Sequence, residues 1–173
     1  MLKASGKSRD RRERIARLHA AVVARAREPV FFTAFGVADS LDGRFDLVAL
    51  HAWLVLDALR RRELNDLSQG LTDALFIGFD EALRELGAGD MSLGRKMKNF
   101  ADAFFGRLKA YGEARSEAEL AEAILRNLYR GGPNLRILRF VGHTQEVHHA
   151  LGALFTQQGA ALARISVIGS GCG

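Results

Sequence analysis

Three histidines near the C-terminal end of the chain are the residue type best suited to metal chemistry. They are His143, His148 and His149, and Glu146 stands three positions before His149. A di-iron site in a helical bundle requires two Glu-x-x-His pairs and two further inward glutamates, and a zinc-binding helix presents two histidines four positions apart. The chain has one such Glu-x-x-His pair, and the adjacent His148 and His149 project about 100° apart on a helix. We therefore expect no metal site and no cofactor.

His51 is a second candidate for chemistry, because it stands in the middle of the most apolar segment. A histidine there can act as a perturbed base or a haem ligand, but a lone core histidine is usually hydrogen-bonded to a neighbour. Nucleophilic groups are few: the single cysteine is the penultimate residue, Cys172, and the sequence has no glycine-flanked serine elbow or phosphate-binding glycine loop. We expect a protein that is not an enzyme. The alternative is a small helical enzyme, or a haem- or metal-binding protein, that uses His51 or the histidine cluster at residues 143–149.

The elements that must position these residues are helices. The chain has 173 residues, 48% of them apolar, which is enough for one well-buried core and short for two domains. There are only two prolines, and apolar residues recur at spacings of three and four. We predict an all-α protein, a single compact bundle of about six or seven helices around a central apolar helix. That central helix is predicted at residues 44–62, where apolar side chains cover nearly the whole circumference.

Capping residues and apolar stripes predict the other helices. They are expected at residues 9–26, 66–86, 90–111, 116–130 and 143–163. Ser116 and Glu119 have the spacing of a capping box. The second and third of these helices carry opposite charge and should pack as an antiparallel hairpin. The aromatic segment 29–37 is predicted to be mostly extended, residues 134–142 fit either a short helix or an extended pass, and the tail 165–173 is predicted to be disordered.

The basic excess of the chain lies at its N-terminus. The net charge is +5, and residues 1–28 hold nine Lys and Arg against three Asp and Glu, which leaves 16 basic and 17 acidic residues elsewhere. We therefore divide the chain into a basic amphipathic arm at 1–28, a helical domain at 29–164 and the tail. The arm is predicted to contact an anionic membrane surface. Its expected contact residues are Arg11, Arg12, Arg14, Ile15, Leu18 and Val22. The alternatives are a soluble tail, packing of the stripe on the body, or contact with RNA phosphates without sequence-specific readout of nucleic acid.

The location of the protein follows from the same features. The longest apolar segment, residues 47–59, is interrupted by His51 and Asp57 and is too short to cross a bilayer. The short apolar patch at residues 20–24 does not resemble a signal peptide, because no cleavage site follows it. A single cysteine excludes an internal disulfide and suits a reducing compartment. We expect a bacterial cytoplasmic protein that lies peripheral to the inner membrane.

Three stretches of the sequence together resemble the ubiquinol-cytochrome c chaperone family. They are LDGRFD at residues 41–46 with Leu50 and His51 after it, LRELGAGDMSL at 83–93, and FFGRLKAY at 104–111. Their order and separation match over about residues 31–129. Ala38, Ser40 and Phe32 depart from the proline, threonine and tyrosine that the family usually has around the first stretch.

The resemblance implies a helical assembly factor for the cytochrome bc1 complex that binds newly made cytochrome b. In mitochondria such a factor works near the ribosomal exit with a small helical partner. We accordingly expect cytochrome b and bc1 assembly intermediates as partners, with the ribosome as a further candidate, and a ribosome-associated RNA-binding adaptor as an alternative function. The expected partner-binding residues are Arg44, Asp46, Lys96, Lys98, Arg107 and Tyr111. Gly106, inside a good helix, costs about 1 kcal/mol relative to alanine, so a close helix contact or an approaching ligand is needed to explain it.

Overall fold

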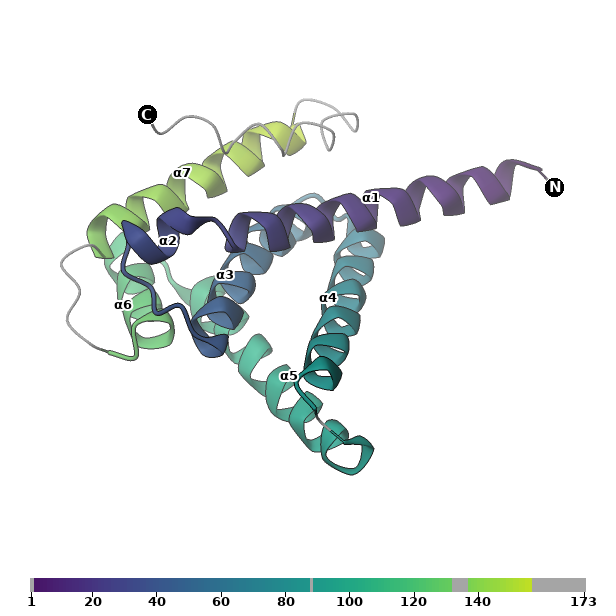
Figure 1. Cartoon of the computed structure of the whole chain (residues 1–173). Helices are drawn as coiled ribbons and strands as arrows, with labels where there is room; N and C mark the ends of the chain where they lie inside the picture. The colour runs from purple at the N-terminus through teal and green to yellow at the C-terminus, as the bar shows by residue number, and fades with distance from the viewer. Residues whose placement is uncertain (1, 88, 132–136, 157–173) are drawn as a thin grey trace.

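The computed structural model describes residues 2–87, 89–131 and 137–156, and these form seven helices without a strand (Figure 1). The helices are α1 (Leu2–Ala26), α2 (Pro29–Thr33), α3 (Leu41–Arg60), α4 (Asn65–Glu85), α5 (Asp90–Glu113), α6 (Glu117–Leu128) and α7 (Ile137–Thr156). The predicted all-α bundle is confirmed. No helix of the described part is long and apolar enough to cross a membrane.

Helix α3 is the centre of the bundle, as predicted. It packs against α1, α4, α5, α6 and α7, and its residues from Asp46 to Leu59 are buried apart from Val48. The helix begins earlier than expected, because the Ser40 hydroxyl accepts a hydrogen bond from the Gly43 amide at 3.1 Å and caps the first turn. Gly43 is required there, since a Cβ would lie 2.1 Å from the Ala38 carbonyl oxygen.

The apolar stripe of α1 lies in the core rather than on a free arm. Leu18 and Val22 are 1% and 2% exposed, and α1 packs against both α3 and α4. Ile15 rests directly on Gly70 of α4, where a Cβ would lie 2.2 Å from the Ile15 Cδ1 atom. Leu18 and Val22 therefore follow the alternative in which the stripe packs on the body, rather than insertion into a membrane. The domain boundary at residue 28 stays a prediction. Figure 1 shows the earlier turns of α1 running on past α4.

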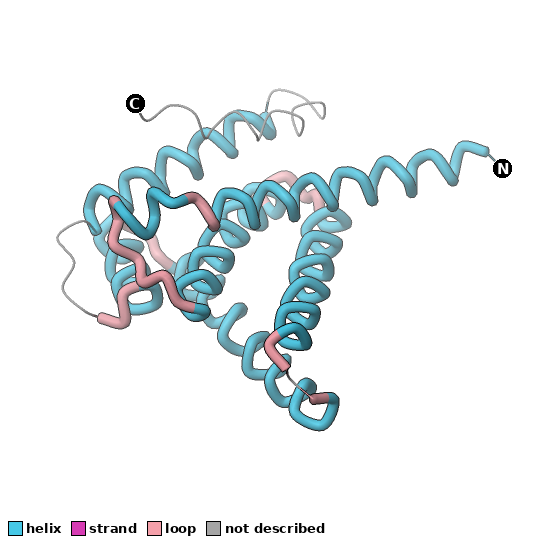
Figure 2. The backbone as a smooth tube through the Cα atoms, in the orientation of Figure 1, coloured by secondary structure: helices cyan, strands magenta, loops and turns pink. Residues whose placement is uncertain are grey.

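The predicted hairpin of α4 and α5 is present, and aromatic rings pack between its helices and α3. In Figure 2 the two helices open from their connection like a V. Phe45 of α3 fits against both, with its ring centroid 5.5 Å from that of Phe79 and 4.9 Å from that of Phe100. Phe76 and Phe104 add an edge-to-face pair at 5.5 Å. Such aromatic pairs stabilise helix packing beyond the area they bury.

Local structure differs from the sequence prediction in one segment and decides between two alternatives in another. Residues 29–33 form helix α2 rather than an extended segment, because Pro29 at a first helical position is compatible with a helix start. Helix α7 begins at Ile137, before the predicted start at residue 143, so residues 137–142 follow the helical alternative. Phe140 and Val141 are buried in the core, which accounts for the longer helix. The predicted disordered tail, residues 165–173, lies outside the described residues.

Candidate partner-binding site

Arg107 and Asp46 form a buried ion pair between α5 and α3. Asp46 is fully buried, and the Arg107 Nε atom donates to its Oδ1 atom at 2.5 Å. Arg107 also donates to the Ala103 carbonyl at 3.0 Å, and its guanidinium carbon lies 5.0 Å from the centre of the Phe45 ring. Burial raises the pKa of the Asp46 carboxyl, while the positive charge of Arg107 opposes that rise. Both residues were predicted to contact a partner, and the structure instead places them inside the bundle.

A second arginine completes this cluster from the end of α6. The Arg130 Nη2 atom lies 2.8 Å from the other carboxylate oxygen of Asp46, although at an angle that does not make a hydrogen bond. Half of the Arg130 side chain is exposed. Arg130 adopts a left-handed backbone conformation with φ of 55°, and Gly131 follows at 73°. The turn after α6 is thus tied to the start of α3.

Tyr111 lies one turn after Arg107 and is also internal. It is 1% exposed, and its ring packs against Trp53 with 5.6 Å between centroids. Its hydroxyl has no hydrogen-bond partner among the described residues. Burial, together with the negative charge of Asp46, raises the pKa of Tyr111. In this structure Tyr111 is an internal residue, and its predicted contact with a partner stays a prediction.

The other predicted partner residues are on the surface. Arg44 is exposed and bonded to Asp39 at 2.7 Å, which holds the turn before α3. Lys96 and Lys98 are exposed on the first half of α5. These three side chains are accessible, but the structure does not gather them with Asp46, Arg107 and Tyr111 into one site.

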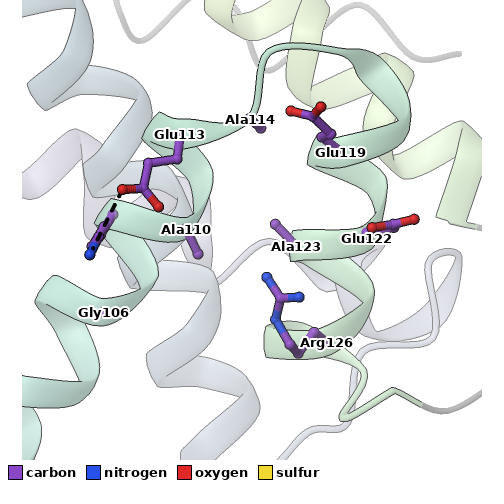
Figure 3. A pocket seen from close by; sticks show the side chains of 9 residues that line it. Gly106, Ala110, Glu113, Ala114, Glu119, Glu122, Ala123 and Arg126 are labelled. Atoms are coloured by element: carbon purple, nitrogen blue, oxygen red, sulfur yellow. Dashed lines mark ion pairs between the residues drawn. The ribbon is translucent and has the colours of Figure 1, made fainter.

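The outer side of α5 forms a cleft of about 310 Å³ with α6, which we call the α5–α6 groove (Figure 3). Small residues line it. They are Gly106, Ala110, Ala114 and Ala123. Figure 3 shows Ala110 and Ala123 facing each other across the groove, with the Arg126 guanidinium in the space between the helices. The small side chains leave room for another element to approach the backbone closely.

No contact within the described part of the protein requires a glycine at position 106. A Cβ built on it would meet nothing within 4 Å, so the close helix contact that could explain it is not present among the described residues. The explanation that remains from the sequence is an approaching ligand or partner. The sequence signal for this groove was available in the four-residue spacing of Gly106, Ala110 and Ala114, but the facing Ala123 and Arg126 come from another helix and could not be found from spacing.

Charged side chains border the groove. Lys109 pairs with Glu113 at 3.8 Å, and Glu119 accepts from the Arg115 amide at 2.7 Å. Arg126 forms no ion pair or side-chain hydrogen bond with a described residue. Among the described residues the groove therefore offers one unpaired cation, Arg126, and one unpaired carboxylate, Glu122.

His51 is a hydrogen-bonded core residue. It is 6% exposed, and its Nδ1 atom donates to the Leu47 carbonyl at 2.7 Å. Burial lowers the pKa of His51 to about 4, so the ring is neutral at neutral pH. The Phe31 ring packs edge-on against it at 5.1 Å.

The histidines at 143–149 have separate environments. The His143 Nε2 atom accepts from Arg25 of α1 at 2.7 Å, whereas the His148 Nε2 atom donates to Asp57 of α3 at 2.8 Å. His149 is exposed. Within the described residues no three His, Cys, Asp or Glu side chains are grouped to hold a metal ion. His143 and His148 each attach α7 to a different helix.

The fold and these contacts place the chain among the helical-bundle proteins. Its buried titratable side chains join one helix to another. A family model described as Ubiquinol-cytochrome C chaperone matches residues 33–167. The chain belongs to this family, which confirms the resemblance found in the sequence. It is similar to the crystal structure of the Cbp3 homolog from Brucella abortus, with a TM-score of 0.81 and 29% identity over 92% of this chain and 91% of that one. The comparison with curated proteins found no match.

Proposed function

We propose that this protein is an assembly chaperone of the cytochrome bc1 complex that binds newly made cytochrome b. The observation that carries the proposal is the family match, which runs from the end of α2 past the end of α7 and so includes every helix around the α5–α6 groove. The likeness to the Brucella abortus Cbp3 homolog extends over nearly the whole of both chains. A binding protein rather than an enzyme is in keeping with the structural use of His51 and His148.

We infer that the client segment is an apolar helix and that it docks in the α5–α6 groove. Helices made for a membrane associate through small residues that let their backbones approach closely. The groove has such a surface at Gly106 and Ala110, with open space above Gly106. Arg126 lies free inside it and can bind carbonyl oxygens at the end of a client helix.

Filling the groove tests this assignment. Gly106→Leu would place a bulky side chain in the groove, while Gly94→Leu puts the same side chain on the same helix at another exposed glycine with nothing within 4 Å of its Cβ. Both changes raise helix propensity, so neither should unfold α5. We expect Gly106→Leu to lose co-purification of cytochrome b and to lower bc1 assembly in cells, and Gly94→Leu to retain both. Equal behaviour of the two variants would reject the groove.

We also propose that the protein attaches to the cytoplasmic side of the bacterial inner membrane. Because the apolar stripe of α1 is buried, only the arginines of α1 would make this contact. Arg11 and Arg12 are exposed, and Arg14 pairs with Asp10 at 2.8 Å on the part of α1 that runs past α4. Each such cation near an anionic surface contributes about 1 kcal/mol. Replacing all three with glutamine should weaken sedimentation with phosphatidylglycerol vesicles. Unchanged vesicle binding with lost affinity for ribosomes would instead assign the arginines to RNA.

A further inference from the structure

A second cleft, which shares Ala114 with the α5–α6 groove, lies where the end of α3 meets α7 and the turn between α5 and α6. It has a volume of about 310 Å³. Three arginines line it: Arg60 at the last position of α3, Arg61 directly after it, and Arg115 from the turn. One wall is the Trp53 ring with the His148 ring stacked on it, 5.4 Å apart at 17°. The cleft thus has a flat aromatic side and a cationic rim.

The carboxylate at the base of this cleft is already fully bonded. Asp57 is 5% exposed, and Arg60 and Arg61 reach its two oxygens at 2.8 and 2.6 Å. The hydrogen bond from His148, with those from the arginines, lowers the pKa of Asp57, so it stays ionised. Asp57 therefore holds two guanidinium groups in place at the rim of the cleft.

Most donors of these arginines remain free. Arg60 uses only its Nη2 atom and Arg61 only its Nε atom on Asp57, and their side chains are 73% and 65% exposed. A guanidinium has five N–H donors, so each keeps an edge for a ligand. The Arg115 guanidinium has no bond or ion pair with any described residue. Three arginines face the cleft against the two carboxylates of Asp57 and Glu117, which leaves an excess of positive charge.

We propose that this cleft binds a phosphate group, carried by a soluble phosphate ester or by a lipid headgroup. Guanidinium groups bind phosphate with paired, charge-assisted hydrogen bonds. Donors that come from two sides, α3 and the turn before α6, suit a tetrahedral group with several acceptor oxygens better than a planar carboxylate, which is met by a single fork. The aromatic wall would contact the apolar or flat part of the ligand next to its phosphate. This site goes beyond the proposed chaperone function and does not depend on it.

The test uses the full chain and two probes. Glycerol 3-phosphate is titrated by calorimetry, and vesicles of phosphatidylcholine with and without phosphatidic acid are used in sedimentation. The variant is Arg115→Gln, whose lost guanidinium bonds no described residue, and the control is Arg95→Gln, an exposed arginine of α5 that lines neither cleft. Thermal melts of both variants should match the native chain, which shows that any loss of binding is local.

We expect saturable binding that Arg115→Gln weakens about tenfold or more, because one charge-assisted bond pair is lost, and that Arg95→Gln leaves unchanged. If Arg115→Gln weakens the binding of glycerol 3-phosphate, the ligand is a soluble phosphate ester. If Arg115→Gln weakens only the binding of vesicles that contain phosphatidic acid, the ligand is a lipid headgroup. The attraction of α1 to vesicles is common to all three proteins and does not affect the comparison. No saturable binding of either probe, or equal loss in both variants, would overturn the proposal.

Discussion

The guanidinium of Arg107 joins several parts of the core at one point. It binds Asp46 of α3, donates to the Ala103 carbonyl of its own helix and lies over the Phe45 ring. Only 15% of the side chain is exposed. At this position a charge is needed to neutralise the fully buried Asp46, and exposure to a partner is not required.

Replacing Arg107 with glutamate should therefore destabilise the fold. Removing one partner of a buried pair leaves an uncompensated charge and costs about 3–5 kcal/mol, and the new carboxylate adds repulsion. Lys98→Glu, an exposed charge reversal on the same helix, should change stability by less than about 0.5 kcal/mol. Urea unfolding of the two variants measures the difference. If Arg107→Glu were as stable as Lys98→Glu, the ion pair would not be structural.

His51 gives the fold a pH dependence whose sign follows from its burial. Its pKa is about 4 in the folded chain against an ordinary 6.5, so the unfolded chain binds a proton first as the pH falls. Stability is full above pH 6.5 and is lost between about pH 6.5 and 4, with about 2 kcal/mol gone at pH 5. His51→Phe keeps an aromatic ring beside Phe31 and removes the titration. Urea unfolding at pH 7.5 and 5 should show a smaller loss in the variant, and an equal loss would assign the effect to other groups such as His143.

At the scale of the elements, helix α1 is the clearest example of what an amphipathic pattern can and cannot predict. The spacing of Ile15, Leu18 and Val22 correctly predicted a helix with an apolar stripe. The same stripe suits a membrane surface or a protein core equally well, because both are apolar. Gly70 on α4 shows that the stripe packs in the core, because its missing side chain leaves the space that Ile15 fills. Gly70 is far from Ile15 in the sequence, so the pattern of α1 alone could not predict this contact.

Two truncations distinguish core packing from a free arm. Removing residues 1–26 exposes the surfaces covered by Leu18 and Val22, and each such side chain contributes about 1.5–3 kcal/mol when buried. We expect this truncation to lower the melting temperature strongly. Removing only residues 1–8 deletes no described core residue and should leave the melting temperature nearly unchanged. If both truncated chains melted like the full chain, the packing of α1 on α3 and α4 would not stabilise the fold.

For the whole molecule, helix periodicity and capping residues were sufficient to predict the all-α class and the central α3, because these signals are local. The capping role of Ser116 is confirmed by its hydrogen bond with the Glu119 amide at 3.2 Å. The candidate site was harder to predict, since Asp46, Arg107 and Tyr111 are polar residues whose burial depends on the packing of α3 against α5. Nothing in their spacing distinguishes a polar residue that holds two helices together from one that meets a partner.

We propose that this protein binds cytochrome b through the α5–α6 groove. The most direct measurement is photo-crosslinking in cells during synthesis of cytochrome b, with the photoreactive residue placed at Ala110 in the groove or at Lys96 on the exposed first half of α5. We expect a cytochrome b adduct from position 110 and little or none from position 96. An adduct from position 96 alone would assign the client to the basic surface of α5 and reject the groove. The absence of any cytochrome b adduct, with the protein folded and bc1 assembly active, would show that the protein does not bind cytochrome b through this groove.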